Sequence, residues 1–172
     1  MEYWDLYDKD RNKLHKKVAS DYKLRDDEFM LVAHLCIFNN KNQLLIQKRS
    51  ENKKLYPSLW DLTISGHVLA NENSRQAMER GCLEEIGYKV NLQSNRAFAT
   101  FNFKEGFDDF FMVSKNLNIK DLSLEKAEVD DIMWASKKEV LELLKSNYFL
   151  PYHKSFIELI FFAKDRLKIH TK

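Results

Sequence analysis

The sequence predicts an α/β domain in which a mixed β-sheet lies between α-helices. Strand-like apolar segments come first, one helical pattern interrupts them, further strands follow, and two helical patterns end the chain. This order is typical of layered α/β domains. The 172 residues, 44% of them hydrophobic, suffice for one buried core, and 4 glycines and 2 prolines leave little room for linkers. We therefore expect a single domain over residues 1–172.

The first part of the chain is predicted to consist of strands. Residues 2–7 indicate a short strand and turn, and a charged stretch through Asp27 follows. Residues 29–38 form an apolar run that is typical of a buried strand. Asparagine-rich residues 39–42 provide turn chemistry, and residues 43–48 return as a second strand. These last two strands are expected to pair as a hairpin.

A helix is predicted in the middle of the chain. Residues 59–64 indicate a short strand that leads to Ser-Gly-His at residues 65–67. Asn73 is expected to cap the helix, with Gln76 as its partner in a capping box, and Gly87 is expected to end it. The apolar face of this helix is predicted to consist of Ala77, Met78, Cys82, Leu83 and Ile86.

The last part of the chain adds strands and then helices. Three further strands are predicted, at residues 96–103, 109–114 and 128–134. Ser136 is expected to cap a helix that ends at Leu144. Pro151 then opens a last helix, expected at residues 152–167. Its predicted apolar face consists of Phe156, Leu159, Ile160, Ala163 and Leu167.

Composition argues against several classes of protein. The net charge is +2 and no long basic run is present, so a nucleic-acid polymer is not an expected partner. The acidic, aromatic N-terminus is unlike a secretory signal, and the longest apolar runs are too short to span a membrane. Cys36 and Cys82 lie in apolar patterns without zinc-type spacing, which indicates buried reduced thiols. We therefore expect a cytoplasmic protein that does not insert into a membrane.

The end of the middle helix suggests metal chemistry. Glu84 and Glu85 are adjacent carboxylates at a helix C-terminus, where they oppose the helix dipole. Arg80 lies four residues before Glu84, within reach of an ion pair, and Glu72 could also contact Arg80 if the preceding loop folds back. Such carboxylates suit Mg²⁺, which usually binds one or two of them together with substrate phosphates. The alternative is that these are solvated charges on an ordinary amphipathic helix.

The spacing of these residues favours the first interpretation. Residues 66–88, GHVLANENSRQAMERGCLEEIGY, resemble the Nudix box, G-x5-E-x7-R-E-U-x-E-E-x-G-U, in which U is a bulky apolar residue. The residues in register are Gly66, Glu72, Arg80, Cys82, Glu84, Glu85, Gly87 and Tyr88, with Cys82 and Tyr88 as loose fits. The resemblance extends over about residues 29–145. It implies the Nudix fold, with an N-terminal strand or hairpin and a C-terminal helix added to that core.

The resemblance also implies the chemistry. Nudix hydrolases bind a divalent metal, such as Mg²⁺ or Mn²⁺, through the box helix, and water attacks a diphosphate linkage. Glu84 and Glu85 are then the expected metal ligands, and the carbonyl of Gly66 is a third candidate. Arg80, with Glu72, is expected to support catalysis by orienting the helix and loop. The implied reaction is cleavage of a diphosphate linkage in a nucleoside diphosphate derivative or a similar small metabolite.

One position departs from the family pattern. Gly81 stands where the box has a glutamate that is often a metal ligand or a general base. Its absence removes a charge from the metal cluster. The alternative function is therefore a catalytically impaired Nudix domain that binds a nucleotide or diphosphate ligand. The candidates for a replacement base are Glu125, Glu128 and Asp130, and those for an extra metal ligand are Asp108 and Asp109.

A second resemblance concerns another branch of the superfamily. KRSENKKLYPSLW at residues 48–60, followed by SGH, resembles the isopentenyl-diphosphate isomerases. Those enzymes need a cysteine before the Gly-His pair and a metal-binding histidine on the early strand, whereas this chain has Ser65 and Met30 there. Isomerase activity is therefore the least favoured of the three functions. His67 is either a metal ligand or a hydrogen-bonded structural residue.

Basic residues before the box suggest where substrate phosphates bind. The strand end and the polar loop at residues 50–57 carry Arg49, Lys53 and Lys54, which could serve as counter-charges. The alternative is that these are solubilising charges. The N-terminal strand and the apolar last helix offer surfaces for a homodimer.

Overall fold

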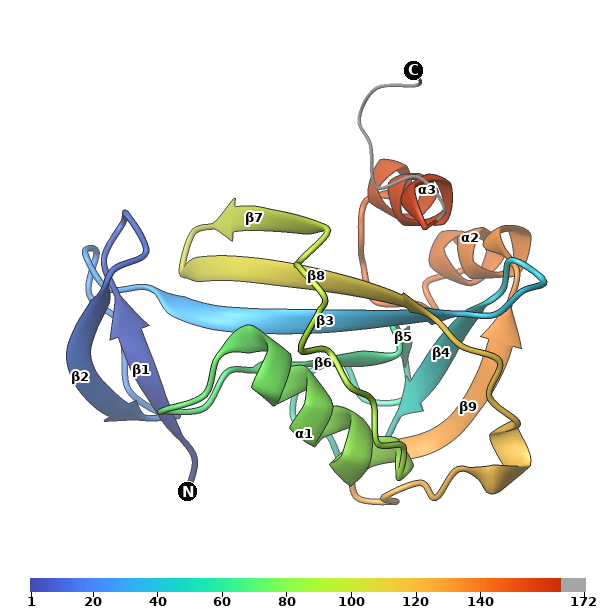
Figure 1. Cartoon of the computed structure of the whole chain (residues 1–172), viewed down its shortest axis with the longest axis horizontal. Helices are drawn as coiled ribbons and strands as arrows, with labels where there is room; N and C mark the ends of the chain where they lie inside the picture. The colour runs from blue at the N-terminus through green and yellow to red at the C-terminus, as the bar shows by residue number, and fades with distance from the viewer. Residues whose placement is uncertain (165–172) are drawn as a thin grey trace.

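The computed structural model describes residues 1–164 and shows the predicted mixed β-sheet between layers of helices (Figure 1). The strands of the main sheet are β3 (Met30–Phe38), β4 (Leu44–Arg49), β5 (Trp60–Asp61), β6 (Ile64–His67), β7 (Ala99–Phe103), β8 (Gly106–Ser114) and β9 (Val129–Ala135). They run in the order β5-β4-β3-β8-β7, with β6 paired to β3 and β9 paired to β4. The β3–β8 pair is parallel and the others are antiparallel, so the sheet is mixed.

Side chains of β3 alternate between two cores, because successive residues of a strand point to opposite faces. The odd-numbered residues from Leu31 to Ile37 pack in the core with α1 (Ser74–Ile86). Even-numbered residues such as Phe38 pack in a second core with α2 (Lys137–Lys145) and α3 (Lys154–Ala163). Burial of both faces explains why β3 is a continuous apolar run.

The helix termini confirm the predicted capping residues. The Asn73 side chain accepts hydrogen bonds from the backbone of Arg75 and Gln76, and the Asn73 N–H donates to the Gln76 side chain at 3.0 Å. Gly87 ends α1 in the left-handed region, with φ 68°. Ser136 caps α2 with the same reciprocal arrangement. A 3₁₀ turn, η1 (Ile119–Asp121), precedes β9.

Both cysteines are buried, as predicted. Cys36 lies in the core with α2 and α3, and Cys82 lies in the core with α1. Burial raises the pKa of each thiol, that of Cys82 to about 12. Neither thiol is therefore ionised near neutral pH.

An N-terminal hairpin lies at one end of the main sheet (Figure 1). Its first strand, β1 (Tyr3–Tyr7), matches the prediction. Its second, β2 (Lys13–Ala19), lies in the charged stretch where no strand was predicted, because Val18 is its one buried side chain. The backbone N–H of Ala70 donates to the Tyr3 carbonyl at 2.7 Å, so the hairpin is attached to the loop before α1.

Some predicted strand boundaries were wrong. The strand expected at residues 59–64 is divided into β5 and β6, because the chain changes its pairing partner from β4 to β3. The strand β8 begins at Gly106, since Gly106 already pairs with Met30 on β3.

Two predicted core positions were also wrong. Leu83 and Leu159 are 53% and 41% exposed. On α1, Leu83 follows the buried Cys82 and is rotated by about 100° around the helix, toward solvent. On α3, which begins at Lys154 rather than residue 152, Ile157 is buried instead. The predicted end of this helix at Leu167 lies outside the described residues.

Strands β3 and β4 separate soon after the turn that joins them. The register pairs Phe38 with Leu44. Further along, β6 pairs with β3, whereas β5 and β9 pair with β4. This separation places the box residues of β6 and α1 beside the end of β4. In the described part of the chain, no helix has the length and apolarity needed to cross a membrane.

Candidate active site

Gly81 allows α1 to lie close to the sheet. A Cβ atom at this position would come within 2.9 Å of Cγ2 of Ile64, a fully buried side chain on β6. Carbon atoms normally approach to about 3.5–4.0 Å. Gly81 therefore has a packing role, which explains a glycine in the helix interior despite a cost of about 1 kcal/mol relative to alanine.

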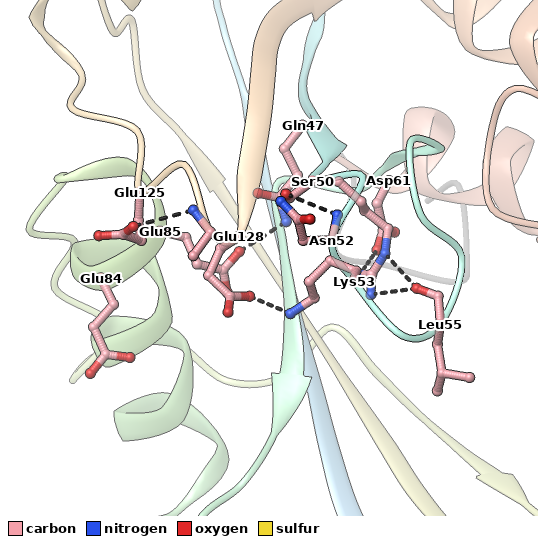
Figure 2. A network of polar contacts seen from close by, with 12 residues as sticks. Gln47, Ser50, Asn52, Lys53, Leu55, Asp61, Glu84, Glu85, Glu125 and Glu128 are labelled. Atoms are coloured by element: carbon pink, nitrogen blue, oxygen red, sulfur yellow. Dashed lines mark hydrogen bonds and ion pairs between the residues drawn. The ribbon is translucent and has the colours of Figure 1, made fainter.

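Glu85 points from α1 toward β4 (Figure 2). Its Oε2 accepts a hydrogen bond from Nε2 of Gln47 at 3.0 Å. Burial raises the pKa of Glu85 to about 7, and the charges of Glu128 and Asp61 act in the same direction, while Gln47 and Lys53 lower it. The Oε1 of Gln47 is buried and has no hydrogen-bond partner in residues 1–164. A positive charge beside Glu85 would stabilise its ionised form.

Arg80 joins the loop before α1 to the helix. Its Nε and Nη2 donate to the two carboxylate oxygens of Glu72 at 2.8 and 3.1 Å. Its Nη1 donates to Glu84 at 3.0 Å. Glu84 is 59% exposed and points away from Glu85 (Figure 2). The two adjacent box carboxylates therefore point in different directions in this structure.

The loop before β9 brings two further carboxylates to the box (Figure 2). The backbone N–H of Glu125 donates to the carbonyl of Glu85 at 3.0 Å. Glu128 forms an ion pair with Lys53. Asp130 lies on β9 and is not part of the cavity lining described below. Of the three predicted candidates for the general base, Glu125 and Glu128 thus lie beside the box.

The three predicted phosphate-binding cations have different environments. The Nη2 of Arg49 donates to the Leu55 carbonyl at 3.0 Å, and its Nη1 donates to Asp61 at 3.4 Å, so Arg49 holds the loop that follows β4. Lys53 is in the ion pair with the β9 loop. Lys54 is exposed and forms no ion pair with another described residue. Its charge is therefore available to a ligand.

A cavity of about 700 Å³ joins these groups. Its lining comes from β3, β6, the end of β4 and α1, and it includes most of the predicted site residues: Gly66, Arg80, Glu84, Glu85, Arg49, Lys53, Lys54, His67, Glu125 and Glu128. Small-molecule sites have volumes of about 300–1,000 Å³. The fold therefore forms one ligand-sized cavity around the box.

A second polar group lies at the same cavity, which His34, Ser65, Asp61 and Tyr152 line, and no sequence motif indicated it. Nδ1 of His34 lies 3.0 Å from Oγ of Ser65, and its Nε2 lies 3.1 Å from Oδ1 of Asp108. The Tyr152 hydroxyl donates to Asp61 at 3.0 Å. These residues come from five separate segments, so only the folded chain brings them together. Asp108, a predicted candidate for an extra metal ligand, is thus bonded to a histidine.

Two other candidates take part in packing and ion pairs. The ring of His67 stacks on Trp4 with 4.2 Å between centroids, and burial lowers the pKa of His67. Asp109 is paired with Arg11 and accepts a hydrogen bond from Thr100 at 2.6 Å. The structure thus gives both residues protein partners.

The donors at the box end fit a hard divalent cation. Glu84, Glu85, Glu125 and Glu128, which carry carboxylates, and Gly66, which offers its carbonyl, all line the cavity. These are oxygen ligands, which Mg²⁺ prefers. Within residues 1–164, no three or more acidic, histidine or cysteine side chains are already grouped to hold a metal. One or two carboxylates and substrate phosphates suffice for Mg²⁺, however, and the half-buried Glu85 has no ion-pair partner among the described residues.

The chain is similar to known proteins over most of its length. The chain matches the NUDIX domain family over residues 28–159. The uncharacterized Nudix hydrolase lmo0368 of Listeria monocytogenes is 41% identical over 170 residues, which cover 99% of each chain. Isopentenyl-diphosphate Delta-isomerase 1 of Photorhabdus laumondii is 28% identical over 63% of this chain and 61% of that protein. The crystal structure of DR0079 from Deinococcus radiodurans has the same fold, with a TM-score of 0.73, 20% identity and coverage of 92% of this chain and 97% of that chain.

Proposed function

Because the chain belongs to the Nudix hydrolase family, we propose that it is a divalent-metal-dependent hydrolase. It would cleave a diphosphate linkage in a nucleoside diphosphate derivative or a similar small metabolite. The observation that carries this proposal is the cavity of about 700 Å³ in which box carboxylates, loop carboxylates and lysines meet. A bound Mg²⁺ or Mn²⁺ would neutralise diphosphate charge and position water.

Residues of the chain would bind the metal, position the box loop and bind the substrate phosphates. Glu84 and Glu85, with the Gly66 carbonyl, would hold the metal. Arg80 would keep the box loop against α1 through its two bonds to Glu72. The available charge of Lys54 would face the substrate phosphates.

The general base in this proposal is Glu128. Its carboxylate is close enough to Glu85 for its charge to raise the pKa of Glu85. The ion pair with Lys53 fixes its position in the cavity. Glu128 would accept a proton from the attacking water, in place of the glutamate that Gly81 replaces.

Metal-dependent phosphate release from a panel of nucleoside diphosphate derivatives tests the proposal. Turnover should require Mg²⁺ or Mn²⁺ and disappear with a chelator. Glu85→Gln should lower kcat/KM by more than about 100-fold, since even the loss of an outer-shell metal partner costs 10–100-fold. Glu142→Gln, at an exposed position on α2, is the matched control and should leave turnover unchanged. Absence of turnover by the unmutated protein across the panel would count against hydrolysis.

A Nudix domain that binds a nucleotide or diphosphate without turnover is the second candidate. Two observations favour it: Gly81 replaces a box glutamate, and Glu84 is bonded to Arg80 and points away from Glu85. Calorimetry that detects tight, metal-dependent binding while no product accumulates would support this function.

Isopentenyl-diphosphate isomerase activity is the third candidate. The isomerase of Photorhabdus laumondii matches only part of this chain. Ser65, a far weaker acid than a thiol, stands before Gly66, and its Oγ lies 3.0 Å from His34. We expect no allylic diphosphate from isopentenyl diphosphate.

A further inference from the structure

The N-terminal hairpin supports the loop that leads into the box helix (Figure 1). We call this loop, residues 68–73 between β6 and α1, the box loop. The backbone N–H of Ala70 donates to the Tyr3 carbonyl at 2.7 Å. The backbone N–H of the next residue, Asn71, donates to Oδ2 of Asp5 at 2.6 Å. Because backbone N–H groups need acceptors, β1 supplies two adjacent residues of this irregular segment with the bonds that a helix or sheet would otherwise provide.

Apolar packing attaches the hairpin at the start of the box loop. The ring of Trp4 on β1 stacks on His67, the last residue of β6, with 4.2 Å between centroids. Leu69 in the box loop packs against the hairpin cluster of Trp4, Leu6 and Val18. The hairpin therefore contacts the box loop through side chains at its start and through hydrogen bonds in its middle.

Asp5 is a buried carboxylate with a cation beside it. Its side chain is 3% exposed, and its Oδ2 lies 2.5 Å from Nζ of Lys13 on β2. Burial raises the pKa of Asp5, but hydrogen bonds from Lys13 and from the Asn71 backbone outweigh it and hold the pKa below its ordinary value. Asn71 has a φ of 71°, which is uncommon for a residue other than glycine. The ionised carboxylate, a strong acceptor, therefore stabilises the box loop at this turn.

Glu72 connects the box loop to α1. Its Oε2 accepts from the Leu69 backbone N–H at 3.2 Å, which closes the loop on itself. Both of its carboxylate oxygens also accept from Arg80. Arg80 in turn donates to Glu84, an expected metal ligand. A continuous path of hydrogen bonds therefore runs from the box loop to a carboxylate of the candidate metal site.

A contribution to stability alone would not require a carboxylate at position 5. Replacement of a buried ion pair by apolar residues of similar volume is often neutral or stabilising. An apolar side chain could fill the same interior, but it could not accept a hydrogen bond from the backbone of Asn71. The feature that distinguishes Asp5 is therefore its directed bond to the box loop.

We propose that Asp5 is a positioning residue for the Nudix box, and that it holds the box loop so that Glu72 orients Arg80. It does not touch the metal or the substrate. The inference rests on the proposed function for the role of Glu84, which Arg80 contacts, as a metal ligand. The match to the NUDIX domain begins at residue 28, so this inference gives a segment outside the matched region a part in the function of the box.

Two measurements on the full chain test this inference. The first is Mg²⁺ affinity by calorimetry. The second is solvent exchange of the Arg80 Nε–H, followed by NMR, because this group donates to Glu72 at 2.8 Å. Asp5→Ala should speed this exchange and weaken Mg²⁺ binding about 10-fold, since loss of an outer-shell partner costs about 10–100-fold. Asp5→Asn keeps an acceptor oxygen without the charge, so its effects should be smaller, and it becomes the test variant if Asp5→Ala does not fold.

Glu28→Gln is the matched control. Glu28 is also a buried carboxylate paired with a hairpin lysine, Lys16. Its other hydrogen bonds come from Tyr22 and Arg25, which lie outside the box loop. Glu28→Gln should therefore lower the free energy of unfolding but leave Mg²⁺ affinity and the exchange of the Arg80 Nε–H unchanged.

Glu72→Ala provides the background that tests the path, because it removes the contact with Arg80. In this background Asp5→Ala should have little further effect on Mg²⁺ affinity, although it should still lower the free energy of unfolding. Additive effects on Mg²⁺ affinity, unchanged affinity and exchange in both Asp5 variants, or equal weakening in Glu28→Gln would overturn the inference.

Failure of the proposed function would give a different result. If the unmutated chain binds no Mg²⁺, metal-dependent hydrolysis is rejected, and the exchange of the Arg80 Nε–H decides the inference. Faster exchange in Asp5→Ala but not in Glu28→Gln would then retain Asp5 as a positioning residue. Equal exchange in the two variants would overturn that role.

Discussion

Gly81 lies one turn before Glu85, on the side of α1 that meets β6. A Cβ atom there would lie 2.9 Å from Ile64 and 3.5 Å from Oε1 of Glu85. A side chain at this position would therefore compete with a core residue for space. The substitution that removes a box carboxylate also allows close helix–sheet packing.

Gly81→Ala is expected to destabilise the fold. Helix propensity alone would favour alanine by about 1 kcal/mol. Overpacking of a core costs about 1–3 kcal/mol, and Ile64 is fully buried without a flexible end that could move away. The free energy of unfolding, measured with urea, should fall by up to about 2 kcal/mol.

Ile64→Ala provides the matched background, because it removes the methyl group that a Cβ atom would meet. In the Ile64→Ala background, Gly81→Ala should lower the free energy of unfolding by less than it does in the unmutated chain. A double-mutant cycle measures this difference. A stabilising effect of Gly81→Ala alone would show that the contact is not tight. For the same steric reason, Gly81→Glu is not expected to increase hydrolysis.

Glu85 is expected to make metal binding depend on pH. A metal ligand must be deprotonated, and burial raises the pKa of Glu85 to about 7. Mg²⁺ affinity, measured by calorimetry, should therefore be higher at pH 8 than at pH 6, with protons released on binding at pH 6. Equal affinity at both pH values would mean that Glu85 is not a ligand.

The stability of the metal-free protein should show the opposite trend. The folded-state pKa of Glu85 lies above its ordinary value of 4.5, so the folded state binds more protons than the unfolded state between pH 4.5 and about 7. The contribution of Glu85 to the free energy of unfolding therefore decreases as pH rises through that range. Thermal unfolding of Glu85→Gln should lack this contribution.

At the scale of elements, the loop after β4 depends on Arg49. Its Nε donates to the Tyr56 carbonyl at 3.2 Å, and Nη2 donates to the Leu55 carbonyl at 3.0 Å. Tyr56 and Ser58 both have positive φ, 52° and 60°, which is unfavourable for residues other than glycine. The guanidinium group therefore stabilises a loop whose backbone is strained.

Arg49→Lys separates the positioning role of Arg49 from its charge. A lysine keeps the charge but cannot donate to several carbonyls in one plane. If Arg49 positions the loop, KM should rise by about 10-fold with little change in kcat, and limited proteolysis should cut the loop faster. Glu51→Gln, at an exposed position of the same loop and outside the cavity lining, is the control. Unchanged KM and proteolysis would instead favour a simple counter-charge.

Elements with local determinants could be predicted from the sequence. The caps at Asn73, Gly87 and Ser136 depend on residues within one helical turn, so their chemistry is visible in the sequence. The strand β2 could not be predicted. It pairs with β1 but buries only one side chain, Val18, so its sequence has no apolar alternation. The box residues could be predicted because the pattern that identifies them is a spacing along the sequence.

At the scale of the whole molecule, the second polar group could not be predicted. His34 and Tyr152 lie far apart in sequence; His34 is a single polar residue in the apolar run 30–38, and Tyr152 directly precedes polar residues at the start of α3. Their proximity depends on the separation of β3 from β4 and on the packing of α3 over the sheet. The divergence of Glu84 from Glu85 likewise depends on Arg80, whose position is set by tertiary contacts.

Carboxylates also attach the N-terminal hairpin to the rest of the molecule. Asp109 on β8 is paired with Arg11 in the hairpin turn. Glu28, before β3, is paired with Lys16 on β2 at 2.5 Å. Hydrogen bonding to Lys16 lowers the pKa of Glu28 to about 2. Burial alone would raise the pKa of Asp109, but hydrogen bonds from Arg11, Ser74 and Thr100 hold it below its ordinary value.

The hairpin is therefore expected to detach in acid. A carboxylate with a lowered folded-state pKa stabilises the fold above its ordinary pKa, 3.8 for aspartate or 4.5 for glutamate, and this contribution is lost as pH falls further. Hydrogen exchange should show the amides of β1 and β2 losing protection between pH 5 and pH 3, before those of the main sheet. Asp109→Asn should weaken this dependence, whereas the exposed control Asp27→Asn should not. Simultaneous loss of protection throughout the chain would contradict the prediction.

The cavity is lined both by the box helix and by the segment that leads into α3, and this has an evolutionary consequence. Its two ends are built from different structural layers: one from α1 and the loop before β9, the other from β6 and the segment that leads into α3. A substitution at Tyr152 lies in a different layer from the glutamates of α1. A descendant chain can therefore change residues of the second layer without changing the glutamates of α1, and relatives that share the box need not share the lining of the whole cavity.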